Sequence, residues 1–142
     1  ISFVFGLPPD KNKTDNLPNT PENNNMEWPE PMGGGYHYMK FEGKFLDSSG
    51  QKINFNCHTG RLEKNGQVHD NSFRIKVPRS SFTMDNDVWE FQLSMNLNEW
   101  FRDPDTFNMQ KFGPAIMGNQ KAQTVLKKNG VDIFSVDYKF KE

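Results

Sequence analysis

Alternation of apolar and polar side chains with a two-residue period is the feature that most constrains the fold of this chain. The clearest run covers residues 88–96, in which every second side chain is large and apolar. Because successive side chains of a strand point to opposite faces of a sheet, the run predicts a strand buried on one side only. One-sided burial is typical of antiparallel sheets.

The same period predicts further strands over residues 1–6, 36–46, 51–58, 71–77 and 131–140. A Ser-Ser-Gly turn at residues 48–50 predicts that the second and third of these pair as a hairpin. Helical signals are fewer. We expect one substantial helix over residues 114–129, with Pro114 in its first turn and Asn129-Gly130 at its end, and a short helical turn within residues 96–102.

Residues 8–35 are dense in Pro, Asn and Gly, so they form neither a long helix nor a central strand. A length of 142 residues corresponds to one domain. The sequence therefore predicts a single domain over residues 1–142. Its fold class is mainly β: an antiparallel β-sandwich with one C-terminal helix and a long Pro/Asn/Gly-rich loop.

Composition excludes several functions. The net charge is −1, so no basic excess indicates a nucleic-acid partner, and no apolar run reaches the length of a membrane span. A single cysteine, Cys57, excludes an internal disulfide and a multi-cysteine zinc site. Because a strand-like run already begins at Ile1, we expect the domain to be truncated at its N-terminus.

Potential metal ligands gather in two short pieces, residues 26–42 and 55–60. These pieces carry His37, His58, Met26, Met32 and Trp28. Neutral imidazole suits copper, and thioether sulfur suits Cu(I). The pattern favours a copper site with His37 and His58 as ligands, Met26 or Met32 as an auxiliary soft ligand, and Trp28 beside it.

Strand parity opposes this grouping. His37 falls on the apolar face of its strand, whereas His58 falls on the face opposite Phe55 and Cys57. The two meet only where a bulge or a strand end redirects one of them, most easily at His58 beside Thr59-Gly60. The alternative is that both histidines and the methionines have structural roles only, and that Trp28 fastens the loop to the sandwich.

Three motifs resemble the MbnP-like copper-associated family, which includes the methanotroph surface proteins MopE and CorA. MEWPEPMGGGYHYMKFEG at residues 26–43 resembles its M-x-W…G-Y-x-x-x-K-x-E-G segment. FNCHTG at residues 55–60 resembles its F-x-x-H-x-G strand, and residues 93–134 resemble its C-terminal stretch. His58, Trp28 and Met26 match the motif positions, whereas His37 lies where the family varies. Some relatives use an oxidised tryptophan, kynurenine, as a ligand beside histidines, and the Trp-x-His pattern that accompanies it is not present in this sequence.

The resemblance implies an extracytoplasmic protein that binds copper, as Cu(I) or Cu(II), and is often encoded near a di-haem partner. The leading hypothesis is a binding protein, not an enzyme, that sequesters or delivers copper. Its expected partners are the copper ion and either another protein or a missing N-terminal segment that completes the sheet. The alternatives are a non-metal cell-surface interaction module and an accessory subunit of a haem redox complex.

Overall fold

Antiparallel strands dominate the structure, a computed structural model that describes residues 1–83 and 88–141. The strands are β1 (Ser2–Phe5), β2 (His37–Leu46), β3 (Lys52–Gly60), β4 (Leu62–Lys64), β5 (Gln67–His69), β6 (Phe73–Lys76), β7 (Val88–Met95) and β8 (Phe134–Lys141). They form four two-stranded sheets, β1–β6, β2–β3, β4–β5 and β7–β8. Every one of these pairs is antiparallel, so the prediction of a mainly β, antiparallel fold is confirmed.

Each predicted strand run contains an observed strand, and the predicted β2–β3 hairpin is present. The β4–β5 hairpin was not predicted. Its strands are too short for a periodic pattern, but its turn carries the Asn65-Gly66 pair, with φ values of 54° and 71°. Positive φ at both positions is what a tight two-residue hairpin turn requires, and Asn-Gly supplies it at low cost.

The helical elements are α1 (Pro21–Asn25), η1 (Glu30–Met32), η2 (Glu99–Phe101), α2 (Met109–Phe112) and α3 (Gln120–Asn129). The predicted helix over residues 114–129 is wrong in its first part, because α3 begins only at Gln120. The Asn119 side chain caps α3 by accepting from the Ala122 amide. Pro114 instead uses its carbonyl to accept from the Asn56 amide at 2.7 Å, which holds this segment alongside β3.

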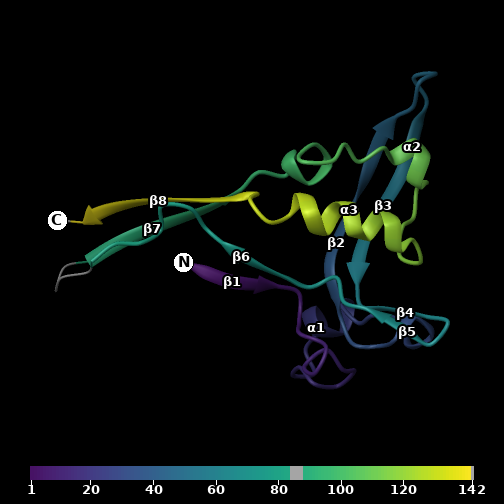
Figure 1. The fold of residues 1–142 in the computed structure, drawn as a ribbon, viewed down its shortest axis with the longest axis horizontal. Helices are drawn as coiled ribbons and strands as arrows, with labels where there is room; N and C mark the ends of the chain where they lie inside the picture. The colour runs from purple at the N-terminus through teal and green to yellow at the C-terminus, as the bar shows by residue number, and fades with distance from the viewer. Residues whose placement is uncertain (84–87, 142) are drawn as a thin grey trace.

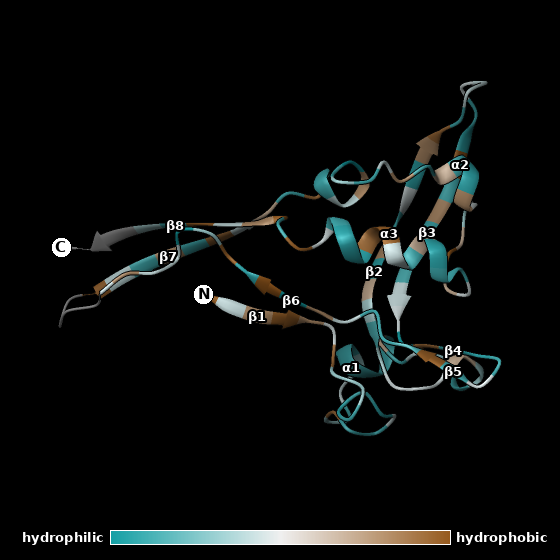
Figure 2. Ribbon diagram, in the orientation of Figure 1, coloured by the Kyte–Doolittle hydropathy of each residue, from teal (hydrophilic) through white to brown (hydrophobic). Residues whose placement is uncertain are grey.

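The core lies between α3 and the β2–β3 hairpin, which α3 crosses (Figure 1). Its buried members are Phe55, Cys57, Trp100, Phe107, Ile116, Ala122, Leu126 and Ile133. Apolar and polar segments alternate along α3 and β3 in Figure 2, as expected for elements with one buried face. The core therefore packs against the side of the hairpin that carries Phe55 and Cys57, and the opposite side is not part of the core.

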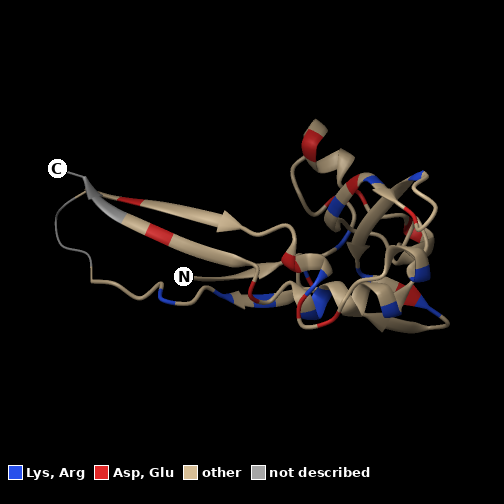
Figure 3. Cartoon of the chain, turned by 90° about the horizontal axis from the view of Figure 1, so that it is seen from above, with Lys and Arg blue, Asp and Glu red and all other residues tan. Residues whose placement is uncertain are grey.

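The β1–β6 and β7–β8 sheets project from this core, as two perpendicular views show (Figures 1 and 3). Phe5 joins the projection to the core by packing on Phe73 and Trp100, with ring centroids 5.4 and 5.1 Å away. Apolar side chains farther along β7 and β8 stay half exposed, at 48% for Leu93 and 47% for Tyr138. None of the helices in the described residues has the length and apolar character needed to cross a membrane.

Candidate metal centre

A bulge in β2 brings the two central histidines to one face of the hairpin. His37 is paired with Gly60, and the next pair is Met39 with Thr59, so Tyr38 is an extra residue in β2. Directly paired residues share a face, and Gly60 lies two residues from His58. His37 therefore lies on the His58 face. The sequence favours an irregularity at the end of β3, beside His58, but the structure has it in β2.

Three rings follow one another along this face. The ring centroids of His37 and His58 are 5.0 Å apart with planes at 83°, and those of Trp28 and His37 are 4.8 Å apart with planes at 78°. Trp28 is only 2% exposed and lies directly over Gly60, where a Cβ atom would come within 2.7 Å of its Cε3 atom. Only glycine leaves room for the indole at this position.

The His37 side chain is held in one tautomer. Its Nδ1 atom lies 3.0 Å from the Met26 carbonyl oxygen, which also accepts from the His37 backbone amide at 2.6 Å. Because a carbonyl only accepts, Nδ1 carries the proton and Nε2 carries the lone pair. That Nε2 atom is buried and has no hydrogen-bond partner within residues 1–83 and 88–141. Such an atom is ready to act as a metal ligand, as histidine ligands commonly donate their other nitrogen to a carbonyl.

Electrostatics keep His37 neutral. Burial lowers the pKa of the His37 imidazole below its ordinary value of 6.5, and the neighbouring charges of His58 and Lys40 lower it further. The hydrogen bond to the Met26 carbonyl opposes this shift without overcoming it. Metals bind imidazole in its neutral form, so the burial of His37 favours the state that a ligand needs.

His58 is paired with a carboxylate that the sequence analysis did not single out. Its Nε2 atom lies 2.6 Å from Glu42 Oε1, and the side chains are 12% and 55% exposed, respectively. Lys40 is the cross-strand neighbour of His58, but its ammonium donates to the Asn25 carbonyl at 3.0 Å. The positive charge of Lys40 is thus tied to the end of α1.

The two other predicted site residues flank His37 in different ways. Trp28 donates from Nε1 to the Met32 carbonyl at 3.3 Å. An unmodified indole has no lone pair to offer a metal, so in this form Trp28 packs against His37 and shields it from solvent. Met26 is half-buried and contacts His37 through its main-chain carbonyl. A ligand role for either residue stays a prediction.

Other soft or ionisable candidates lie elsewhere. Cys57 is 2% exposed and on the opposite face of β3, and burial raises the pKa of its thiol to about 11, so it stays protonated. The third histidine, His69, belongs to the separate β4–β5 sheet. Within residues 1–83 and 88–141, no three His, Cys, Asp or Glu side chains cluster as a metal site would. The His37–His58 pair is therefore a two-residue core that needs a ligand of another kind.

Asn12 supports the site from the long loop and was also missed. It is fully buried, its Oδ1 accepts from the Tyr36 amide at 2.7 Å, and its Nδ2 donates to the Tyr38 hydroxyl at 3.0 Å. These two tyrosines flank His37 in the chain, so Asn12 fastens both sides of the bulge. The sequence offered no signal for this role, because Asn12 lies among several loop asparagines.

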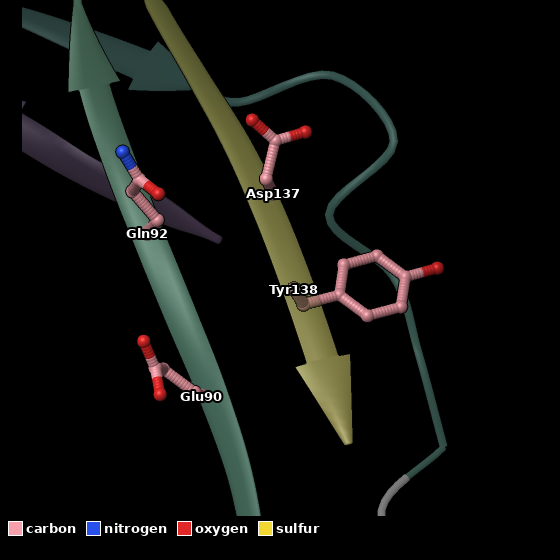
Figure 4. A pocket seen from close by; sticks show the side chains of 4 residues that line it. All are labelled: Glu90, Gln92, Asp137 and Tyr138. Atoms are coloured by element: carbon pink, nitrogen blue, oxygen red, sulfur yellow. The ribbon is translucent and has the colours of Figure 1, made fainter. Parts of the chain in front are cut away.

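A shallow pocket of about 100 Å³ lies on the projecting β7–β8 sheet (Figure 4). It is lined by Glu90 and Gln92 from β7 and by Asp137 and Tyr138 from β8. These residues offer oxygen and amide groups but no imidazole or thioether. The pocket therefore does not share the chemistry of the His37–His58 face.

Comparison with known protein families finds a match to the family model described as MbnP, over residues 1–120. The matched span includes β2, β3 and the loop that carries Trp28, and with them the three ring residues Trp28, His37 and His58. Neither the curated proteins nor the solved structures gave a match.

Proposed function

The chain belongs to the MbnP family, and from this premise we propose that it is an extracytoplasmic copper-binding protein with a site built around His37 and His58. The observation that carries the proposal is the Nε2 atom of His37. It is buried and bears a lone pair, and none of the described residues bonds to it, although the His58 ring centroid is only 5.0 Å from that of His37.

An unpartnered buried polar atom is costly. Leaving such a group without a hydrogen bond destabilises a fold by about 1–3 kcal/mol, so most are satisfied in native proteins. A metal ion bonded to Nε2 would remove this cost. The rings of His37 and His58 are close enough for one ion to contact a nitrogen of each.

Copper suits this donor set. Imidazole ligands bind copper strongly, and Cu²⁺ stands at the top of the affinity order for divalent first-row metals. Bound copper would supply a positively charged, redox-capable centre, which His37 and His58 would hold. The remaining ligand positions would fall to water or to a soft donor, for which Met26 is the candidate that the family motif suggests.

We assign the site to binding and transfer of copper, without catalysis. Glu42 and the edge of His58 reach solvent, with exposed fractions of 55% and 12%, while Trp28 closes the opposite end at 2%. An ion can thus enter and leave at the His58 end of the row. This one-sided access suits a protein that takes up copper and hands it on.

A copper titration of the metal-free protein tests the proposal. The wild type is expected to bind one copper ion per chain, and the double variant His37→Ala/His58→Ala is expected to lose this binding. His69→Ala is the matched control, because it removes a histidine from another sheet and should leave binding unchanged. Copper binding by the double variant with wild-type affinity would refute the assignment.

A second candidate function, a surface interaction module, rests on the projecting sheets. The exposed apolar side chains Leu93 and Tyr138 on β7 and β8 favour this alternative, in which a protein partner and no metal would be bound. An accessory subunit of a haem redox complex would use the same surface. Elemental analysis of protein reconstituted with copper separates the alternatives, since an interaction module would retain none.

A further inference from the structure

We propose that Glu42 is a positioning residue for the metal centre. It holds the His58 imidazole in the tautomer protonated at Nε2, so that Nδ1 is the nitrogen offered to the metal. The tautomer assignment follows from the contact between Glu42 and His58, and the metal-binding part rests on the proposed function.

The position of Glu42 follows from the hairpin register. Lys40 pairs with His58 and Glu42 pairs with Asn56, so Glu42 is the diagonal neighbour of His58 on the same face. Its Oε1 atom lies 2.6 Å from His58 Nε2, a short distance typical of a charge-assisted hydrogen bond. An ionised carboxylate only accepts, so the proton between the two atoms belongs to Nε2.

His37 has the opposite arrangement. There the Met26 carbonyl accepts from Nδ1, at 3.0 Å, and Nε2 is left with the lone pair. The two histidines therefore present different nitrogens, Nε2 from His37 and Nδ1 from His58. Each ring is anchored through its other nitrogen, an arrangement that fixes ring orientation and increases ligand basicity.

A competing role for Glu42 is that of a direct metal ligand. The contacts favour a positioning role, because the Glu42 carboxylate already has His58 as its partner. Among the described residues, His37, His58 and Glu42 also do not form a three-residue group that could hold a metal ion. The two roles differ in the metal-free protein. A positioning residue controls the His58 tautomer before any ion arrives, whereas a direct ligand need not.

Long-range ¹H–¹⁵N correlation spectra of the metal-free protein test the assignment at pH 8, well above the ordinary histidine pKa of about 6.5. In the wild type we expect His58 protonated at Nε2 and His37 protonated at Nδ1. Glu42→Ala is expected to give a mixture of tautomers at His58 and no change at His37. Glu42→Gln should largely keep the Nε2 tautomer, because its amide oxygen still accepts. A His58 tautomer that is unchanged in Glu42→Ala would overturn the proposal.

Chelator competition then measures copper affinity. Loss of an outer-shell partner typically lowers metal affinity by about 10–100-fold, which is the range expected for Glu42→Ala, with Glu42→Gln between it and the wild type. Glu90→Gln removes the same charge from the β7–β8 sheet and should bind like the wild type. Reduced affinity with an unaltered tautomer would identify a direct ligand and refute positioning. If the wild type binds no copper, the proposed function fails, while the metal-free spectra still decide the role of Glu42.

Discussion

The imidazole rings of His37 and His58 lie 5.0 Å apart on one face of the β2–β3 hairpin, although regular alternation along β2 would separate them. The extra residue Tyr38 produces this relationship, because it pairs His37 with Gly60. Gly60 lies on the same face of β3 as His58, whereas regular pairing would place His37 on the face of Cys57. The proximity of the two histidines therefore depends on the bulge, and the residues that hold the bulge can be tested by substitution.

Asn12→Ala is expected to destabilise the protein. It removes the acceptor of the Tyr36 amide and the donor to the Tyr38 hydroxyl at a fully buried position. Leaving buried groups unpaired costs about 1–3 kcal/mol, which urea unfolding would measure as a lower free energy of unfolding. Asn16→Ala is the control, since that exposed residue should change stability by less than about 0.5 kcal/mol. Equal effects of the two variants would contradict a stabilising role for the Asn12 hydrogen bonds.

Gly60→Ala is expected to displace Trp28. The new Cβ atom would lie 2.7 Å from Trp28 Cε3, and overpacking of this kind costs about 1–3 kcal/mol. The indole N–H signal of Trp28 in an NMR spectrum should shift, and the free energy of unfolding should fall. Gly118→Ala provides the control, because no atom of the described residues lies within 4 Å of the added Cβ atom. An unmoved indole signal in Gly60→Ala would contradict the close packing.

Stability should depend on pH through His37. Burial lowers its folded-state pKa below the 6.5 of an ordinary histidine, so the unfolded chain binds more protons as the pH falls. The contribution of His37 to stability is therefore complete above pH 6.5 and is lost as the pH falls through the folded-state pKa. NMR titration of the metal-free protein should give a His37 midpoint below 6.5, and a midpoint above 6.5 would refute the shift.

The strands could be predicted from sequence because period-two alternation reports directly on which face is buried. The start of α3 could not, because Pro114 suits a helix but instead bonds to Asn56, a tertiary contact that local signals do not report. The β4–β5 hairpin was missed for a different reason. Its strands of three residues are too short for periodicity, although Asn65-Gly66 marked the turn.

Three side chains that lie together at the candidate site could be singled out from the sequence, but their arrangement could not. His37, His58 and Trp28 are brought together, yet parity alone placed the histidines on opposite faces, since a bulge of one residue has no sequence signature of its own. Glu42 could have been found by pairing the strands about the turn at residues 48–50, which makes it the diagonal neighbour of His58. Asn12 is brought to the bulge only by the folded loop.

Copper K-edge X-ray absorption of the one-to-one copper complex tests the central claim most directly, because imidazole rings give distinctive outer-shell scattering. The account expects two imidazole ligands in the wild type and one in each of His37→Ala and His58→Ala. The His69→Ala complex should retain two. A spectrum without imidazole scattering, or one that is unchanged in both His37→Ala and His58→Ala, would contradict a copper site at these histidines.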